Sequence, residues 1–248
     1  MMRIHHLSEN GGPSRLKVTL LVPVLNEIEG MREIMPRIRS EWVDEIIVVD
    51  GGSVDGSAEY ARNHGYRLIH QQRKGFRYAY VEALPQITGD VLMTFSPDGN
   101  CIPERIPAAI DKIKQGYDMV IVSRYADGAS SDDDSRITAL ANRVFTLTIN
   151  ILFRGRYTDA LGVFRAYKTD LISALDLDKA ASYWPWESLF KKTMSWEPLL
   201  SIRAAKRRLR VADVPGDEPC RIGGRRPLHV RWGFAYILQV FQEVFVWR

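Results

Sequence analysis

The sequence contains few cysteines and no long hydrophobic run. Cys101 and Cys220 are the only cysteines among 248 residues; they are too few for a disulfide framework and lack the paired spacing of a zinc site. The apolar run at 18–25 has the length of a strand, whereas a membrane-spanning helix needs about 20 such residues. Residues 1–17 are polar and lack the apolar core of a signal peptide. We therefore expect a cytoplasmic protein with a flexible leader over residues 1–17.

Two nucleotide-binding fingerprints are also missing. No Gly-x-Gly-x-x-Gly follows a predicted strand, and no Walker A loop with its lysine occurs. The five histidines are scattered and have no metal-ligand spacing. These absences argue against a dinucleotide-dependent dehydrogenase and against a P-loop nucleotidase.

Positive charge is concentrated near the C-terminus. The chain has 34 Lys and Arg against 30 Asp and Glu, a net charge of +4, and the basic excess lies in residues 188–248. Such a region needs an anionic partner, for example a phosphate group or an anionic membrane surface. Because no RNA-binding motif of aromatic and basic residues occurs, we expect no nucleic-acid binding.

Strand and helix patterns alternate along the first half of the chain. Short β-branched runs precede segments with apolar residues at helical spacing, which predicts a parallel sheet covered by helices. The predicted strands lie at 18–24, 45–49, 67–70, 90–95 and 119–123, and the predicted helices at 27–40, 57–64, 76–84 and 103–116. We therefore expect one α/β domain of the Rossmann-like type, with a mostly parallel central sheet and helices on both faces.

The alternation ends after residue 124. The small, acidic segment 126–134 predicts a solvated loop. The later predicted elements are a helix at 136–153, a strand at 159–167, helices at 169–175 and 185–194, a strand or helix at 199–210, a strand at 211–214 and an amphipathic helix at 230–247.

Polar residues gather directly after four of the predicted strands. They occupy 23–27, 50–53, 96–100 and 123–124. In open α/β sheets the ligand binds outside the carboxyl ends of the strands. Carboxylates and amides next to an arginine suit a ligand with hydroxyl groups and a metal-chelated diphosphate, because hard divalent cations choose oxygen ligands.

These segments resemble a known family. In order, they are 22–27 (VPVLNE), 48–57 (VVDGGSVDGS), 74–75 (KG), 96–100 (SPDGN), 122–125 (VSRY) and 159–167 (DALGVFRAY). The set is similar to family-2 glycosyltransferases of GT-A fold, and within them to the dolichyl-phosphate mannosyltransferase-like and polyprenyl-phosphate glycosyltransferase branch. The resemblance extends over about residues 18–226.

The resemblance implies an inverting enzyme that transfers a hexose from a GDP- or UDP-sugar, assisted by Mg²⁺ or Mn²⁺. The acceptor that it implies is a polyprenyl or dolichyl lipid phosphate. Two alternatives stay open: a soluble or glycan hydroxyl acceptor, and a catalytically impaired subunit that only binds the nucleotide-sugar. The implied organisation is a nucleotide-sugar-binding half at 18–125, an acceptor-binding half at 126–226 and an amphipathic C-terminal helix at 227–248.

The resemblance also implies a set of donor-site residues. The nucleotide-sugar-binding positions are Pro23, Leu25, Glu27, Val49, Asp50, Gly51, Lys74, Gly75, Ser96, Pro97 and Asp98. The family's D-x-D-x-Q motif falls on 96–100, so Asp98 and Asn100 are the expected metal ligands. Ser96 replaces the first carboxylate, which should weaken metal binding. Gly51 stands where relatives often carry Asp, so the choice between guanine and uracil stays open. Taken alone, Asp98 fits a turn residue and Glu27 an acid in the first turn of a helix.

A second set concerns catalysis and the acceptor. The expected catalytic residues are Asp98, Arg124 and Glu187. A guanidinium at Arg124 would stabilise the departing nucleoside diphosphate, and Glu187 would act as base or orient the acceptor if that acceptor is an alcohol. The expected ligands of an acceptor phosphate are Arg136, Arg165, Arg221 and Arg225.

The basic run 206–210 and the terminal helix together predict a basic amphipathic surface. Such a surface fits peripheral contact with the cytoplasmic face of a membrane or contact with partner helices. The alternatives are that the apolar face of the helix packs on the domain itself or on a second copy in a homodimer.

Overall fold

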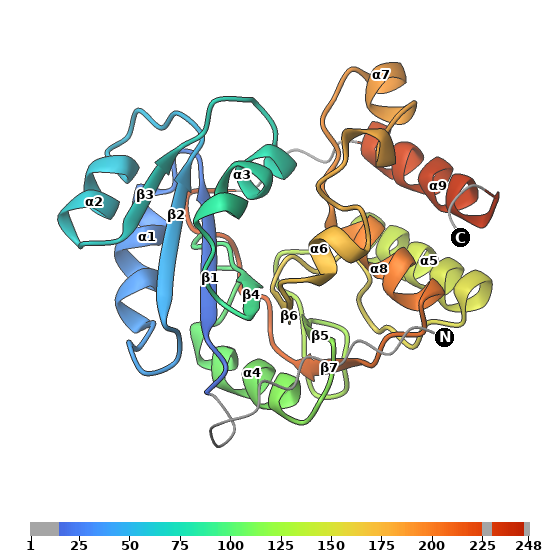
Figure 1. The fold of residues 1–248 in the computed structure, drawn as a ribbon, viewed down its shortest axis with the longest axis horizontal. Helices are drawn as coiled ribbons and strands as arrows, with labels where there is room; N and C mark the ends of the chain where they lie inside the picture. The colour runs from blue at the N-terminus through green and yellow to red at the C-terminus, as the bar shows by residue number, and fades with distance from the viewer. Residues whose placement is uncertain (1–14, 225–229, 246–248) are drawn as a thin grey trace, which may run out of the picture.

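A seven-stranded sheet runs through the molecule in the order β3-β2-β1-β4-β6-β5-β7 (Figure 1). The structure is a computed structural model that describes residues 15–224 and 230–245. The strands are β1 (Val18–Val24), β2 (Glu45–Asp50), β3 (Arg67–His70), β4 (Val91–Thr94), β5 (Met119–Ser123), β6 (Arg165–Lys168) and β7 (Val211–Pro215). The sheet therefore contains strands from both the first and the last part of the chain.

All neighbours in the sheet are parallel except those of β6, which lies antiparallel between β4 and β5. The central strands are continuous apolar runs because both faces of the sheet are covered. Leu21 of β1, for example, is fully buried and lies between Ile47 of β2 and Thr94 of β4. The predicted fold class, an α/β domain with a mostly parallel sheet, is confirmed.

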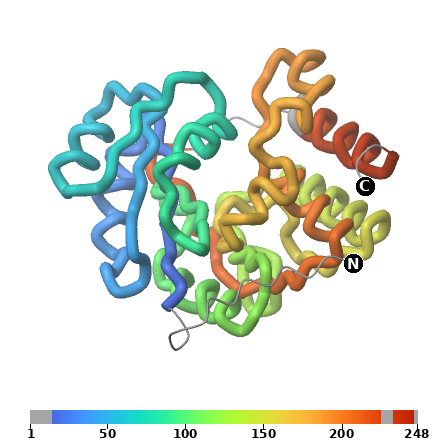
Figure 2. The backbone as a smooth tube through the Cα atoms, viewed as in Figure 1, coloured from blue at the N-terminus to red at the C-terminus, as the bar shows by residue number. Residues whose placement is uncertain are grey.

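Helices cover the two faces of the sheet with separate apolar clusters. The helices are α1 (Ile28–Ile34), α2 (Ser57–Asn63), α3 (Phe76–Ala83), α4 (Ile106–Lys114), α5 (Arg136–Phe153), α6 (Leu171–Ala174), α7 (Trp186–Phe190), α8 (Glu197–Lys206) and α9 (Val230–Phe245). Side chains of α1, α2 and α4 belong to the cluster on one face, and those of α3, α5, α6, α8 and α9 belong to the cluster on the other. Figure 2 shows the chain passing from the blue end of the sheet to the yellow and red helices at the other end.

Several predicted elements differ from the structure; the helix expected at 185–194, for example, is restricted to α7, Trp186–Phe190. The helix expected at 27–40 ends at Ile34 and continues as a 3-10 turn over Met35–Arg37, because Pro36 cannot donate the next helical hydrogen bond. The ambiguous segment 199–210 is helical as far as Lys206, where α8 ends, and residues 207–210 form the turn before β7. The strand expected at 159–167 is restricted to Arg165–Lys168, since the residues before it form a loop around the Arg165 side chain.

Within the described ranges, no helix combines the length and the hydropathy that crossing a bilayer requires. The leader expected at 1–17 falls mostly outside the described residues, which begin at Arg15. Arg225 and the start of the segment expected at 227–248 also lie outside them.

Candidate active site

Three cavities meet along the carboxyl edge of the sheet. The strand-end cavity is lined by residues after β1 and β2, by 71–76 and by 221–224. The central cavity is lined by the turn after β4, by Arg124 after β5 and by 216–218 after β7. The lysine cavity is lined by 74–76, 191–193 and Tyr236. Phe76 lines all three, and Arg221 lines the strand-end and central cavities. A ligand that extends from one cavity to the next would therefore pass these two residues.

The wall of the strand-end cavity is built from two loops that hydrogen-bond to each other. Asn26 adopts a left-handed conformation (φ 56°) directly after β1. Its backbone N–H donates to the Ser53 hydroxyl, and its side-chain oxygen accepts from the Val54 N–H at 2.9 Å. The Glu27 N–H donates to Ser57 at 3.0 Å. These bonds hold the loop after β1 against the loop after β2 and fix the position of Glu27.

Of the residues expected to bind the nucleotide-sugar, six line this cavity: Pro23, Leu25, Glu27, Gly51, Lys74 and Gly75. Ser96 and Asp98 line the central cavity. The structure does not bring the other three into any of the three cavity walls. Val49 is part of the apolar core, and the Asp50 carboxylate accepts hydrogen bonds from the Gly52 and Ser53 N–H groups. Pro97 directs its backbone toward Gly30 of α1.

Asp98, Glu27 and Arg221 form a buried triad at the boundary of the strand-end and central cavities. Arg221 donates through one terminal nitrogen to Asp98 and through the other to Glu27. Both carboxylates are buried, and only 9% of the Arg221 side chain is exposed. The Ile222 N–H donates to the Asp98 carbonyl at 2.7 Å, which fastens this segment to the turn after β4. Arg221, expected at an acceptor phosphate, therefore lies between two carboxylates that were expected at the donor site.

Arg124 lies in the central cavity among three carboxylates. Its Nε is 3.1 Å from Asp159 and 3.7 Å from Asp134, and its Nη1 contacts Glu218 at 2.5 Å. Burial alone would lower the pKa of Arg124, but the three carboxylates outweigh it and raise the pKa above the usual arginine value. Burial also raises the pKa of Glu218. Arg124 is thus a fixed, fully charged cation at the position expected from the sequence.

The three carboxylates around Arg124 were not anticipated as a site. The acidic segment 126–134 is a loop, as predicted, but it is not simply solvated. Asp134 approaches Arg124, and the Asp132 N–H donates to the Glu218 carbonyl at 2.9 Å. Asp159 belonged to the motif at 159–167, and Asn142 of α5 donates to it at 2.8 Å. The available sequence signal was a run of three aspartates, Asp132–Asp134, that begins eight residues after Arg124.

Arg165 is a structural residue and cannot contact an acceptor phosphate. Its side chain is fully buried, and it donates to the Gly162 carbonyl at 2.7 Å, to Ser201 at 3.1 Å and to the Glu197 carbonyl at 3.3 Å. A buried guanidinium needs acceptors for its donors. The loop 159–162 supplies two of these acceptors and also lines the central cavity. Arg165 therefore supports the wall of the central cavity from the protein interior.

Glu187 and Arg136 are also not part of the three cavity walls. The Glu187 carboxylate pairs with the buried Arg77 at 2.7 Å and accepts from the Met194 N–H at 2.7 Å. Arg136 is exposed at the start of α5 and lines a separate groove with Tyr125 and Arg143. The expected role of Glu187 as a base is therefore not supported, because both of its oxygens have partners inside the protein.

The central cavity presents a sparse set of metal ligands. Asp98, Ser96 and Asn100 line it. The Asn100 side-chain nitrogen donates to the Pro219 carbonyl at 2.8 Å, which identifies its oxygen as the available ligand atom. Among the described residues, no group of three or more His, Cys, Asp or Glu is arranged to hold a metal ion. Mg²⁺ is commonly held by one or two carboxylates together with substrate phosphates. Both Asp98 oxygens already accept hydrogen bonds, from Arg221 and from the Asn100 N–H, so Asp98 and Asn100 fit a cation only where the diphosphate of a bound nucleotide supplies most of its ligands.

Residues 19–175 match the sequence model of the family described as Glycosyl transferase family 2. The chain belongs to this family. It is 27% identical over 207 residues to Glycosyltransferase AglJ of Haloferax volcanii, covering 82% of this chain and 63% of that protein. It is 25% identical over 210 residues to the undecaprenyl-phosphate mannosyltransferase of Micrococcus luteus, covering 81% of this chain and 82% of that one.

A third relative is considerably longer than this chain. The undecaprenyl-phosphate 4-deoxy-4-formamido-L-arabinose transferase of Pectobacterium carotovorum subsp. carotovorum is 29% identical over 172 residues, which cover 64% of this chain and 50% of that protein. The matches thus span only 63% of the length of AglJ and half of the arabinose transferase.

Solved structures with the same fold hold divalent metals. The crystal structure of glucosyl-3-phosphoglycerate synthase from Mycobacterium tuberculosis with Mn²⁺, UDP and phosphoglyceric acid superposes with a TM-score of 0.66 at 18% identity, covering 94% of this chain and 80% of that one. The same enzyme with Mg²⁺ and UDP superposes with a TM-score of 0.65. The sheet and its helices are therefore those of the GT-A fold.

Proposed function

We propose that this chain is an inverting hexosyltransferase that moves a sugar from a nucleotide-diphospho-sugar to a lipid phosphate. The observation that carries the proposal is the position of Arg221, which lies between two carboxylates where the strand-end cavity opens into the central cavity. The names of the relatives from M. luteus and P. carotovorum support undecaprenyl phosphate as the class of acceptor. The cytoplasmic location expected from the sequence is part of the proposal.

The donor would extend from the strand-end cavity into the central cavity. The base and ribose would lie between the loop after β1 and residues 71–75, next to Pro23, Leu25 and Gly51. The diphosphate would then reach the boundary at Arg221, and the sugar would enter the central cavity. The donor half at 18–125 thus needs Arg221 from the second half of the chain to be complete.

A divalent cation would be held by Asp98 and Asn100, and it would neutralise charge on the diphosphate. The guanidinium groups of Arg221 and Arg124 lie at the same cavity and are positively charged without a metal. They would stabilise the negative charge that develops on the leaving nucleoside diphosphate.

The transfer forms one bond and breaks one. An oxygen of the acceptor phosphate attacks the anomeric carbon of the sugar, the bond from that carbon to the β-phosphate oxygen breaks, and the nucleoside diphosphate leaves with the electron pair. Attack opposite the leaving group inverts the anomeric centre. A phosphate acceptor is already anionic, so it needs no strong base, and the ion pairing of Glu187 with Arg77 is compatible with that chemistry.

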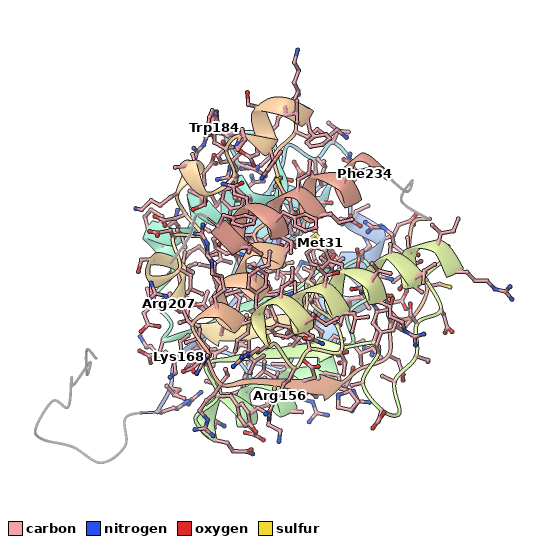
Figure 3. The ribbon with its side chains drawn as sticks, turned by 90° about the vertical axis from the view of Figure 1, so that its right-hand side faces the viewer. Met31, Arg156, Lys168, Trp184, Arg207 and Phe234 are labelled. Carbon is pink, nitrogen blue, oxygen red and sulfur yellow. The ribbon has the colours of Figure 1, made fainter. Side chains whose placement is uncertain are left out.

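The apolar surface of α5 and α9 supports contact with a membrane. Among the residues whose exposure the structure describes, thirteen of the fifteen exposed large hydrophobic side chains lie on α5, on α9 or in 184–189. Figure 3 looks onto this side of the molecule, with Trp184 and Phe234 labelled above Arg156 and Arg207. A broad apolar face bordered by basic side chains fits the interface of an anionic bilayer, which is where a polyprenyl phosphate would be found.

Two alternatives have their own supporting observations. The M. tuberculosis neighbour was crystallised with phosphoglyceric acid, a soluble compound, so a soluble acceptor is the second candidate. Ser96 in place of a carboxylate supports a subunit that binds the donor without transferring sugar.

The decisive experiment offers GDP- and UDP-hexoses with Mg²⁺ or Mn²⁺ and measures released nucleoside diphosphate with and without a short polyprenyl phosphate. Release that depends on the lipid phosphate is expected, whereas donor binding without any transfer would support the impaired subunit.

A further inference from the structure

The lysine cavity is a second binding site beside the central cavity. It has a volume of about 710 Å³ and lies between the start of α3, the loop 191–195 and α9. None of its lysines on the loop 191–195 was predicted to bind a ligand. We propose that this cavity binds the phosphate end of the lipid acceptor, with Lys191 and Lys74 at the phosphate and the first isoprenoid units against its apolar wall. The identity of the acceptor in this proposal rests on the proposed function.

The lysine cavity adjoins the central cavity, where the proposed function places sugar transfer. Phe76, Leu161 and Val163 line both it and the central cavity. A phosphate at this shared wall would therefore face the anomeric carbon of a sugar in the central cavity. Attack with inversion requires the acceptor to approach the anomeric carbon from the side opposite the diphosphate. The proposed function places the diphosphate at Arg221, on the side of the strand-end cavity.

The charge of the cavity favours an anion. Lys74, Lys191 and Lys192 line it, and within residues 15–224 and 230–245 neither the Lys74 nor the Lys191 ammonium has an ion-pair partner. The single acid in the wall is Glu197, which is 1% exposed and accepts hydrogen bonds from the Tyr80 and Ser195 hydroxyls. The Glu197 carboxylate thus has its hydrogen-bond partners within the protein. The charged groups that can contact a ligand in this cavity are the lysine ammonium groups.

The remaining wall is apolar, which distinguishes a lipid phosphate from a soluble one. Phe76, Leu161, Val163, Pro198 and Tyr236 contribute to it. Tyr236 belongs to α9, whose outer side exposes Phe234, Ile237 and Phe241. An isoprenoid chain leaving the cavity past α9 would therefore meet the apolar face proposed to contact the membrane. A phosphate on a small polar molecule would leave this wall in contact with water.

Hydrogen bonds hold the backbone of the loop that carries Lys191, beginning with the Lys191 N–H, which donates to the Glu187 carbonyl. The Met194 N–H donates to Glu187, the Ser195 N–H donates to the Tyr236 hydroxyl at 3.2 Å, and the Thr193 hydroxyl donates to the Lys74 carbonyl at 3.3 Å. A Cβ on Gly75 would lie 2.4 Å from Thr193, so the glycine permits this close approach. Glu187, together with Arg77, is then a positioning residue for the lysine loop.

The test compares Lys191→Ala with Lys179→Ala, a control at an exposed lysine away from the three cavities. Loss of a charged hydrogen bond should raise the KM for a short polyprenyl phosphate roughly tenfold or more. The KM for the nucleotide-sugar should not change, and Lys191→Arg should restore the acceptor KM. A second variant, Leu161→Trp, fills the apolar wall that the lysine and central cavities share and should abolish any preference for longer over shorter polyprenyl phosphates.

Binding of the lipid phosphate without donor, followed by tryptophan fluorescence, separates the two proposals. Lys191-dependent binding without sugar transfer by the natural sequence would support the cavity and refute the proposed function. Sugar transfer with the same acceptor KM in Lys191→Ala and Lys179→Ala would refute the cavity and support the function. Phosphoglyceric acid acting as well as polyprenyl phosphate, with no effect of Leu161→Trp, would also overturn the assignment of a lipid to this cavity.

Discussion

Arg221 and Asp98 are 123 positions apart in the sequence and share a hydrogen bond at the boundary of the donor cavities. The same guanidinium also donates to Glu27, so one side chain from the C-terminal part neutralises two buried carboxylates of the N-terminal part. This contact joins the first strand end, the turn after β4 and the segment after β7. Arg221 therefore stabilises the fold at this boundary, and in the proposed function it also completes the donor site.

Replacement of Arg221 should affect stability and donor binding together. Arg221→Ala leaves Asp98 and Glu27 buried without their partner, which should reduce the free energy of unfolding by about 3–5 kcal/mol. Donor affinity should fall as well, since a phosphate-facing cation is lost. Urea unfolding and calorimetric titration with the nucleotide-sugar measure the two effects. Arg207→Ala, at an exposed position after α8, is the matched control, and equal behaviour of the two variants would contradict the role of Arg221.

The protein alone should have a low affinity for divalent cations, and the bound donor should raise that affinity. Asp98 is the one carboxylate of the 96–100 segment, so a divalent cation should bind poorly to the protein alone and much more tightly once the diphosphate supplies oxygen ligands. Calorimetric titration of Mn²⁺ with and without nucleoside diphosphate checks this. Asp98→Asn should abolish the nucleotide-dependent binding, whereas Asp90→Asn, at a carboxylate just before the opposite end of β4, should not. Tight binding of Mn²⁺ to the nucleotide-free protein would contradict this prediction, because it would require protein ligands for the metal other than Asp98 and Asn100.

The ionised carboxylate of Glu82 should stabilise the loop that carries Lys74. Its carboxylate accepts from the Gln72 N–H at 2.6 Å and from the Arg73 N–H at 3.0 Å. Burial acts to raise the pKa of Glu82, but the hydrogen bonds from Gln72 and Arg73 outweigh it and lower the pKa. Because the pKa is lower in the folded protein, this carboxylate stabilises the fold above its unfolded pKa, and the contribution disappears as the pH falls through the folded pKa.

The corresponding experiment follows urea unfolding between about pH 7 and pH 3.5 in the natural sequence and in Glu82→Gln. The difference in the free energy of unfolding should be largest near neutral pH and should shrink toward low pH. Glu82→Gln should also raise the KM for the donor at neutral pH, since residues 71–75 line the strand-end cavity. Glu59→Gln, at an exposed position on α2, is the control. If the difference in the free energy of unfolding grew as the pH fell, the pKa of Glu82 would be raised in the folded protein, contrary to this prediction.

The apolar face of α5 and α9 should bind anionic vesicles. Phe241→Ser and Leu147→Ser remove exposed apolar side chains, one from each helix, and each should reduce cosedimentation with vesicles that contain phosphatidylglycerol. Val54→Ser is the control, because Val54 is 91% exposed on the loop after β2. Sedimentation velocity gives the competing result: if the natural sequence is a dimer that these two variants dissociate, the face is an interface between copies of the chain.

Arg165 should be essential for stability even though it contacts no ligand. Arg165→Met removes a fully buried guanidinium and leaves the Gly162 carbonyl and the Ser201 hydroxyl without their donor. The free energy of unfolding should fall by about 3 kcal/mol or more. A variant that unfolds like the natural sequence but has lost affinity for the acceptor would instead place Arg165 at the acceptor phosphate.

The sequence by itself determined the fold class, the family and most of the strand-end cavity. The continuous apolar runs of β1, β2 and β5 specify buried parallel strands, and the polar residues after them must lie at one edge of the sheet. Pro23, Leu25, Glu27 and Gly51 therefore came together as expected. The helix predicted at 136–153 matches α5 over its whole length, because its apolar residues keep helical spacing and Ser135 caps its start.

Only the tertiary structure decided what the charged residues contact. Whether a guanidinium faces a ligand or the protein depends on acceptors brought to it by distant segments, and local sequence patterns do not contain that information. Arg165 is surrounded by carbonyls of its own loop and of α8, Glu187 is paired with an arginine 110 positions away, and Arg221 crosses to Asp98. Burial makes these pairings obligatory, because a charge without a partner inside the protein would cost several kcal/mol.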